Sequence, residues 1–413
     1  MRGGDFVRAV TGLDDPGSLG LCPSRLARID GWMDGLVADG RLAGLSVAVM
    51  RRGGLAYRRC HGLADRERGT PFADDTIVRI YSMTKPLVSA AIMMLYEEGR
   101  FQLDDPISRV LPCFAGQRVF VGGGGANLAT TPAARDISFR DLLTHTSGLT
   151  YGFMEATPVD ALYRTEGIDF QTSDASLGDL VQRAAALPLL AQPGQAWNYS
   201  IATDVLGHLV EVLSGRDLAT FLIERILTPL GMTDTGFHVP ADELPRFAAN
   251  YARGRRGLRL IDDPAASRFA SPKPLCSGGG GLCATAGDYL RFCRMMLGGG
   301  ELDGVRLLGR KTVALMTANH LGCDMAQMGQ LRFSESTCEG IGFGLGFSVM
   351  LDPARAQILG SPGEYAWGGA ASTAFWIDPA ESMIVILLTQ LMPSSALAIR
   401  RELRVLTYQA IID

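Results

Sequence analysis

The chain has 413 residues, 47% hydrophobic and 20% charged, a composition typical of a globular protein and not of a disordered one. Its net charge of −4, with no Lys/Arg cluster interleaved with aromatic residues, excludes the basic footprint of a nucleic-acid-binding protein. The length exceeds that of one usual core and predicts two domains or one large α/β body with insertions.

The N-terminal stretch, M-R-G-G-D-F-V-R-A-V-T-G-L-D-D, has neither the apolar run nor the small-residue cleavage site of a secretory signal. The longest apolar run, around 383–388, is too short to span a bilayer and indicates a buried strand. Eight cysteines form no C-x-x-C pair and are expected to be reduced thiols. We therefore expect a cytoplasmic protein with no membrane attachment and no nucleic-acid partner.

Patterns at the two ends of the chain predict strands with a helix beside them. Residues 24–40 carry apolar side chains at helical spacing and end at a glycine. A β-hairpin is expected next, with strands at 45–50 and 55–60 around the turn R-R-G-G. A second hairpin is expected at 372–390, where D-P-A-E-S separates two apolar strands, and an amphipathic helix follows Pro393.

The middle of the chain, about 85 to 300, is mainly helical in pattern, and its glycine-rich segment 121–132 predicts a long loop. The predicted fold class is therefore α/β, with an antiparallel sheet built from both chain ends, flanked by helices, and an inserted mainly helical domain. We place the discontinuous α/β domain in residues 1–84 and 300–413 and the helical domain in 85–299. The active site is expected between them.

A serine and a lysine stand three residues apart in Y-S-M-T-K-P, residues 81–86. The chain has only three lysines, and of these only Lys85 has a serine, Ser82, three places before it. Lysine can accept a proton when burial makes it neutral, which arginine cannot do. At the junction of a predicted strand (76–81) and a helix, this spacing puts both side chains on one face, and the helix N-terminus disfavours a protonated lysine. The pattern suits an activated nucleophile, and an N-cap serine beside a surface lysine is the alternative.

Two further stretches carry candidate residues. Q-P-G-Q-A-W-N-Y-S (192–200) places Tyr199 in a polar turn before a long helix, where a tyrosine is either structural or a proton shuttle. E-Y-A-W-G-G-A-A-S-T-A-F-W-I (364–377) places Trp367, Gly368 and Gly369 at the start of a C-terminal strand, where paired glycines allow a ligand to approach the backbone. An N–H just after them would suit one half of an oxyanion hole opposite the N–H of Ser82, and a β-bulge is the alternative.

These stretches, in this order from about residue 25 to 410, resemble the β-lactamase-like serine hydrolases, and particularly the family VIII carboxylesterases. That family looks like class C β-lactamases and D-alanyl-D-alanine carboxypeptidases in fold. Segments 140–153 and 277–292 also look familial. The resemblance implies Ser82 as nucleophile and Lys85 with Tyr199 as general base and acid. It further implies the backbone N–H groups of Ser82 and Ala370 as the oxyanion hole, with the W-G-G residues 367–369 in contact with substrate.

The resemblance implies a serine carboxylesterase that hydrolyses small or short-chain carboxylic esters through a covalent acyl-enzyme. Class C lactamases follow the tyrosine by alanine and asparagine, whereas Ser200 and Ile201 follow it here, and the lysine of K-T-G is missing. Both departures argue against strong lactamase activity. The alternatives are a β-lactamase or D-amino-acid peptidase, a small-amide hydrolase, an acyltransferase and a non-catalytic ligand-binding member.

No metal or cofactor is predicted, because the five histidines show no ligand spacing such as H-E-x-x-H. His145, in T-H-T-S-G, is expected to hydrogen-bond within a turn, since no G-x-S-x-G elbow accompanies it. The expected partner is a small-molecule ester. The sequence leaves open homo-oligomer formation, the acyl chain length and the stereopreference.

Overall fold

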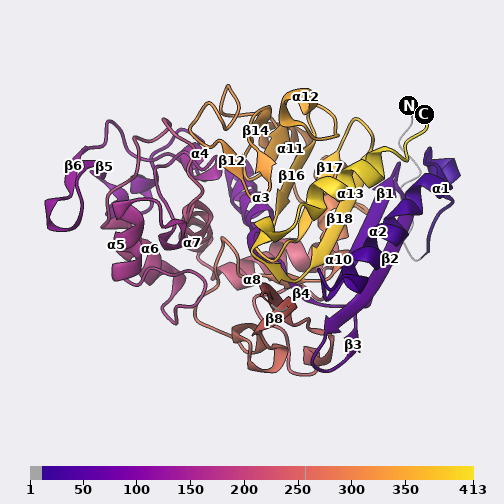
Figure 1. Ribbon diagram of the computed structural model, residues 1–413. Coiled ribbons are helices and arrows are strands. Elements are labelled where there is room, and N and C mark those ends of the chain that lie inside the picture. Colours follow the sequence, from indigo (N-terminus) through magenta and orange to yellow (C-terminus); the bar gives the residue numbers. More distant parts are fainter. Residues whose placement is uncertain (1–11, 256) are drawn as a thin grey trace.

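In the computed structural model, which describes residues 12–255 and 257–413, one antiparallel sheet joins the two ends of the chain (Figure 1). The strand order is β14-β15-β16-β17-β18-β1-β2-β3, and every neighbouring pair is antiparallel. The strands are β1 (Gly44–Arg51), β2 (Gly54–Asp65), β3 (Thr70–Pro71), β14 (Ile341–Phe343), β15 (Ser348–Met350), β16 (Tyr365–Gly368), β17 (Ala374–Asp378) and β18 (Met383–Thr389). The predicted fold class is confirmed.

Strands β1 and β18 lie in the middle of the sheet because both are apolar on both faces. Every residue of the two strands is buried, and their register runs from Leu45 opposite Thr389 to Arg51 opposite Met383. Runs rich in Val, Ile and Leu suit a strand covered on both sides. Apolar side chains of α2 (Arg28–Ala38) and α13 (Ile399–Tyr408) cover one face, and α10 (Ala286–Leu297) packs on β18 (Figure 1).

The remaining helices lie mostly in the middle of the chain. Helix α3 (Thr84–Glu97) is buried over most of its length and packs on α7 (Ala202–Ser214). The other α-helices are α1 (Pro23–Leu26), α4 (Phe139–Leu143), α5 (Pro158–Thr165), α6 (Leu177–Ala185), α8 (Leu218–Leu222), α9 (Thr228–Leu230), α11 (Arg310–Met316) and α12 (Pro353–Ala356). None of the described helices is long and apolar enough to span a bilayer.

Short strands complete the fold outside the main sheet. They are β4 (Val78–Arg79) with β9 (Cys283–Ala284), β5 (Arg118–Gly122) with β6 (Ala129–Pro132), β7 (Asn250–Gly254) with β8 (Gly257–Asp262) and β19 (Leu391–Met392), β10 (Glu301–Leu302) with β11 (Val305–Arg306), and β12 (Arg332–Phe333) with β13 (Ser336–Thr337). The last of these pairs, the β12–β13 hairpin, borders the cavity described below.

Three local predictions differ from the structure. The strand expected at 76–81 is limited to β4, because Tyr81–Met83 form a 3₁₀ turn. The glycine-rich segment 121–132 is not one long loop, because β5 and β6 pair across it. Trp367 and Gly368 end strand β16, and Gly369 follows it, so the W-G-G stretch does not begin a strand.

The boundaries of the two expected domains, 1–84 with 300–413 and 85–299, stay a prediction. A single apolar cluster continues from sheet residues such as Ile386 to helical residues such as Leu206. The two parts are therefore packed on a common core.

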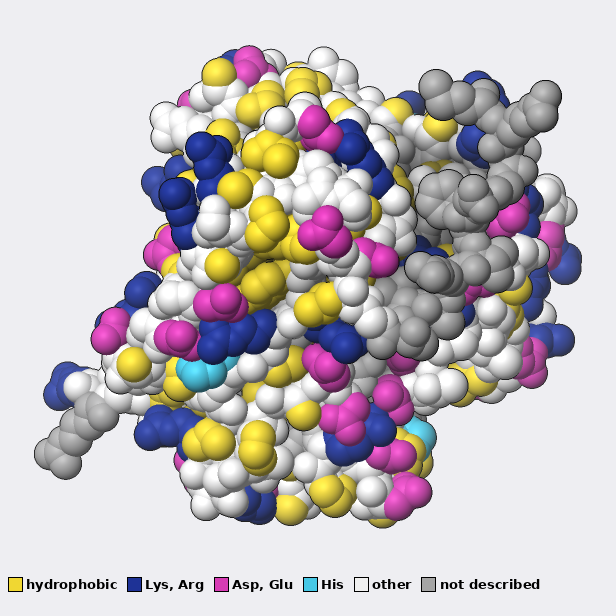
Figure 2. Space-filling model, turned by 90° about the vertical axis from the view of Figure 1, so that its right-hand side faces the viewer, with side chains coloured by type: hydrophobic (Ala, Val, Ile, Leu, Met, Phe, Trp, Pro, Cys, Tyr) yellow, Lys and Arg dark blue, Asp and Glu magenta, His cyan; other side chains and the backbone are white. Residues whose placement is uncertain are grey.

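On the face shown in Figure 2, basic and acidic side chains are intermixed, with hydrophobic side chains between them. Neither sign of charge dominates the described part of that face.

Candidate active site

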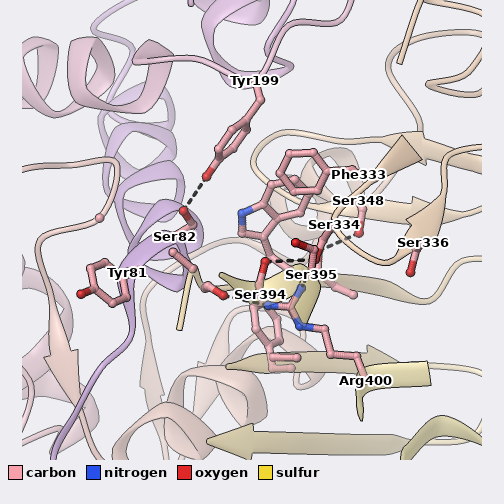
Figure 3. Close-up of a pocket in the computed structure, with 18 of the residues that line it drawn as sticks. Tyr81, Ser82, Tyr199, Phe333, Ser334, Ser336, Ser348, Ser394, Ser395 and Arg400 are labelled. Atoms are coloured by element: carbon pink, nitrogen blue, oxygen red, sulfur yellow. Dashed lines mark hydrogen bonds between the residues drawn. The ribbon is translucent and has the colours of Figure 1, made fainter. Parts of the chain in front are cut away.

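Ser82 lies in the 3₁₀ turn Tyr81–Met83, which leads directly into α3. Tyr81 has a φ of 43°, in the left-handed region, which costs a non-glycine residue about 1–3 kcal/mol. The Tyr81 ring packs edge-on against Phe269, and its hydroxyl accepts a hydrogen bond from Asn250 at 3.1 Å. Burial raises the pKa of Tyr81 to about 12. These contacts hold the strained residue and so fix the position of Ser82 at the cavity (Figure 3).

The structure brings Ser82, Lys85 and Tyr199 together. The Tyr199 hydroxyl points at Ser82 Oγ, with 2.5 Å between the two oxygens (Figure 3). Lys85 Nζ lies 3.4 Å from Ser82 Oγ and 4.6 Å from the centre of the Tyr199 ring. Lys85 is 2% exposed, so the alternative of a surface lysine is wrong.

The amine of Lys85 has two further partners that the sequence did not predict. It donates to the carbonyl oxygen of Gly279 at 2.6 Å and to the Tyr151 hydroxyl at 3.1 Å. Asp204 holds the turn that carries Gly279, because its carboxylate accepts from the Ser277 hydroxyl at 2.6 Å and from the Gly279 N–H at 2.9 Å. A Cβ on Gly279 would lie 2.4 Å from Asp204 Oδ2, so this close approach requires glycine.

Burial is the main cause of the pKa shifts of Asp204 and Tyr151, the ionisable groups near Lys85. It raises the pKa of Asp204, although the charge of Lys85 opposes this shift. Burial, together with the charge of Asp204, raises the pKa of Tyr151 well above its ordinary value. Tyr151 is therefore a neutral phenol whose oxygen accepts the hydrogen bond from Lys85.

The W-G-G stretch lies against the turn that holds Ser82. The Gly369 N–H donates to the Thr373 carbonyl at 2.9 Å, and Arg400 of α13 donates to the carbonyls of Gly369 and Thr373 at 2.7 and 2.9 Å. The Ala370 N–H donates no hydrogen bond to any described residue, and Ala370 lines the same cavity as Ser82. Burial lowers the pKa of Arg400.

A cavity of about 350 Å³ opens beside Ser82, between the helical segment and the sheet. Phe153, Met154 and Phe170 line one part of it. Phe333 of β12 lines another, where it stacks on Trp367 with ring centres 5.3 Å apart and lies 4.9 Å from the Tyr199 ring.

His145 is buried beside the site, with its ring against that of Tyr199. Its Nδ1 lies 3.3 Å from Ser200 Oγ, and its ring centre lies 5.2 Å from that of Tyr199. Burial, together with the charge of Lys85, lowers the pKa of His145 well below its ordinary value. Within residues 12–255 and 257–413, no three His, Cys, Asp or Glu side chains come together as metal ligands.

Four residues around the site were missed from the sequence: Tyr151, Asp204, Gly279 and Arg400. Tyr151 and Gly279 fall in the two segments that look familial, but those segments did not reveal which atoms face the lysine. An aspartate in the first turn of a mainly apolar helix was the only signal for Asp204. Arg400 had no signal beyond its place in the C-terminal helix.

Comparisons with known proteins show the family and the fold of the chain. The family model described as Beta-lactamase matches residues 29–409. The chain is similar to Protein Rv1367c of Mycobacterium tuberculosis, at 40% identity over 86% of this chain and 87% of the relative. It is also similar to Esterase EstB of Burkholderia gladioli, at 35% identity over 91% of this chain and 93% of the relative.

A solved structure described as "EstCE1, a hydrolase with promiscuous acyltransferase activity" is 28% identical, with a TM-score of 0.79 over 94% of this chain and 99% of that one. The fold is thus shared over nearly the whole length. The chain belongs to the beta-lactamase family, with a fold like that of the family VIII carboxylesterases.

Proposed function

We propose that the protein hydrolyses small or short-chain carboxylic esters through a covalent acyl-enzyme on Ser82. Its family and its esterase relative make the chain a carboxylic-ester hydrolase. The observation that carries the mechanism is the hydroxyl of Ser82, at the edge of a cavity and within reach of both the Tyr199 oxygen and the buried Lys85 amine. A hydroxyl with a base in reach, and a further group that orients the base, is the general arrangement of an activated nucleophile.

In the first step Ser82 Oγ attacks the ester carbonyl carbon, and the Lys85–Tyr199 pair takes its proton. Lys85 would act as the base in its neutral form, in which the amine has two N–H donors and one lone pair. The donors are occupied by Gly279 and Tyr151, so the lone pair is left for the Ser82 hydroxyl. Tyr199 then passes a proton to the leaving alkoxide as the C–O bond breaks. Water attacks the acyl-enzyme with the same pair as base, which releases the acid and regenerates Ser82.

The oxyanion of the tetrahedral intermediate would accept hydrogen bonds from the backbone N–H groups of Ser82 and Ala370. The Ala370 N–H has no other described acceptor, and the carbonyl of the preceding Gly369 is fixed by Arg400. Loss of one such donor lowers kcat by about 10²–10³-fold in a serine hydrolase. The site would thus join Tyr199 of the helical segment (85–299) to Ala370 of the sheet segment (300–413).

An acyltransferase is the second candidate, because the hydrolase EstCE1, similar to this chain, is described as having promiscuous acyltransferase activity. In that reaction an alcohol, not water, attacks the acyl-enzyme, and the residues keep the same roles. The ratio of the two products decides between the candidates.

The test is ester turnover by wild type and by Ser82→Ala. Purified protein is given p-nitrophenyl acetate, butyrate and octanoate, then a chromogenic cephalosporin, each with and without a primary alcohol. We expect turnover of the shorter esters, little opening of the cephalosporin and no turnover by the variant. Equal turnover by wild type and variant would exclude Ser82 as the nucleophile. A transferred ester exceeding the free acid would favour the acyltransferase.

A further inference from the structure

We propose that the alcohol half of the natural ester carries several hydroxyl groups, as in a polyol or sugar ester, and is not a plain alkyl chain. The inference rests on the proposed function, because it uses the direction in which Tyr199 hands a proton to the leaving alkoxide. It adds a hydrogen-bonding subsite on one wall of the cavity.

The geometry gives the direction of the alcohol half. The alkoxide must leave next to the Tyr199 hydroxyl, which lies 2.5 Å from Ser82 Oγ. The neighbours of the Tyr199 ring on the cavity wall include Phe333, at 4.9 Å, and Trp367, at 5.9 Å between ring centres. Beyond them Figure 3 shows a group of serines and Arg400, whereas Tyr81 lies on the other side of Ser82. In the proposed complex the alcohol half extends toward the serines.

This wall, called the hydroxyl wall below, is assembled from three separate segments of the chain. Its members are Ser334, Ser336 and Thr337 of the β12–β13 hairpin, Ser348 of β15, and Ser394 and Ser395 after β19. These residues come from three separate segments, so a local sequence bias does not explain why they meet. Their convergence on one cavity indicates a surface that forms hydrogen bonds.

Ser334 fixes the middle of the hydroxyl wall. Its Oγ donates to Glu335 Oε2 at 2.8 Å, accepts from Arg400 Nη1 at 3.3 Å and lies 3.0 Å from Ser394 Oγ. Its φ of 56° is in the left-handed region, which these contacts stabilise. This part of the wall is set in place before a ligand arrives.

Other polar groups on the same wall have no partner. The hydroxyls of Ser336 and Ser395 make no hydrogen bond with any described residue, although both serines line the cavity. Ser336 is half-buried and Ser395 is exposed, so both hydroxyls are accessible and can exchange water for hydrogen bonds to ligand oxygens.

The neighbouring rings fit the same ligand. The stacked rings of Phe333 and Trp367 offer an apolar surface to the C–H groups of a polyol, while its hydroxyls face the serines. The opposite part of the cavity, at Phe153, Met154 and Phe170, has no comparable group of hydroxyls and suits an apolar acyl chain. A cavity of about 350 Å³ accommodates a small ester of this kind.

The experiment compares two butyrate esters that differ only in the alcohol half: 2,3-dihydroxypropyl butyrate and n-pentyl butyrate. Their alcohol halves have the same number of non-hydrogen atoms, and acid release is followed by pH-stat titration. We expect wild type to prefer the dihydroxy ester by about tenfold or more in kcat/KM, because a site built to hydrogen-bond a hydroxyl rejects the analogue that lacks it.

The paired variant combines Ser336→Ala and Ser395→Ala in one chain. The matched control is Ser271→Ala, because Ser271 is exposed and does not line the cavity. The paired variant should lower the dihydroxy-to-pentyl preference by about two- to tenfold for each lost hydroxyl, and the control should keep it. The preference is a ratio within one preparation, so partial unfolding does not change it.

Two results would overturn the subsite. One is wild-type kcat/KM for the pentyl ester that equals or exceeds that for the dihydroxy ester, and the other is a preference unchanged in the paired variant. If wild type cleaves neither ester, the proposed hydrolysis fails as well. Cleavage of the pentyl ester without a preference removes only the hydroxyl wall from the account.

Discussion

Replacing Gly369 by alanine inserts one methyl group between the W-G-G stretch and the turn that carries Ser82. The added Cβ would lie 2.4 Å from the carbonyl oxygen of Ile80 and 2.3 Å from Thr373 Oγ1. Ile80 stands two residues before Ser82, and its carbonyl belongs to the backbone, so it cannot rotate away as a side chain could. The strand end must therefore move away from the serine.

The size of the movement follows from these distances. An ordinary contact begins at 3.4 Å, so a Cβ at 2.4 Å from the Ile80 oxygen must retreat by about 1 Å. A misplacement of about 1 Å in a catalytic group lowers the rate by about 10²-fold. Overpacking of this kind also lowers the free energy of unfolding by about 1–3 kcal/mol.

The assay is p-nitrophenyl butyrate turnover, with urea unfolding measured in parallel for Gly369→Ala and Gly31→Ala. Gly31 lies in α2, and no atom lies within 4 Å of the position that an added Cβ would take, so alanine there should leave activity unchanged. Alanine in place of a helical glycine should raise stability by about 0.5–1 kcal/mol. If Gly369→Ala keeps kcat within about threefold of wild type, the W-G-G stretch does not place the oxyanion donor.

Three further substitutions test the neighbouring groups. Tyr199→Phe removes one oxygen and should lower kcat by about 10²–10⁴-fold with little change in the urea midpoint, whereas unchanged kcat would exclude Tyr199 from proton transfer. Lys85→Arg introduces a side chain that stays protonated and cannot accept a proton, so esterase activity should fall to background, and activity within tenfold of wild type would exclude Lys85 as the base. Because burial and the charge of Lys85 lower the pKa of folded His145, the unfolded state binds more protons below about pH 6.5, and His145 contributes stability that is lost as the pH falls. The stability difference between wild type and His145→Gln should therefore shrink from pH 7.5 to 5.5 by up to about 1.4 kcal/mol per pH unit, and a constant difference would refute the argument.

The sheet could be predicted from the sequence because its central strands have recognisable local patterns of apolar and turn residues. The fully apolar run that forms β18 and the hairpin of β1 and β2 need only periodicity and turn residues to be recognised. Strands β14, β15 and β16 were not individually predicted. Two of them have only three residues and the third has four, too few for alternation to show.

Ser82 and Lys85 could be predicted as reacting side chains because one short motif contains both of them. Ser82 and Lys85 meet because a helical turn separates them, which is a local property of the chain. The surroundings of Lys85 depend on tertiary structure: Tyr151, Asp204 and Gly279 come from three distant segments and meet only in the folded chain. The hydrogen bonds from Arg400 to Gly369 and Thr373 span the turn between β16 and β17 in the same way.

The most direct test of the central claim is the site of covalent labelling by an active-site phosphonate ester. Wild type and Ser82→Ala are treated with a p-nitrophenyl alkylphosphonate, and intact mass and peptide mapping locate the adduct. The account predicts one adduct per chain, on Ser82, in wild type and no adduct in the variant. An adduct on another residue, or equal labelling of the variant, would contradict it.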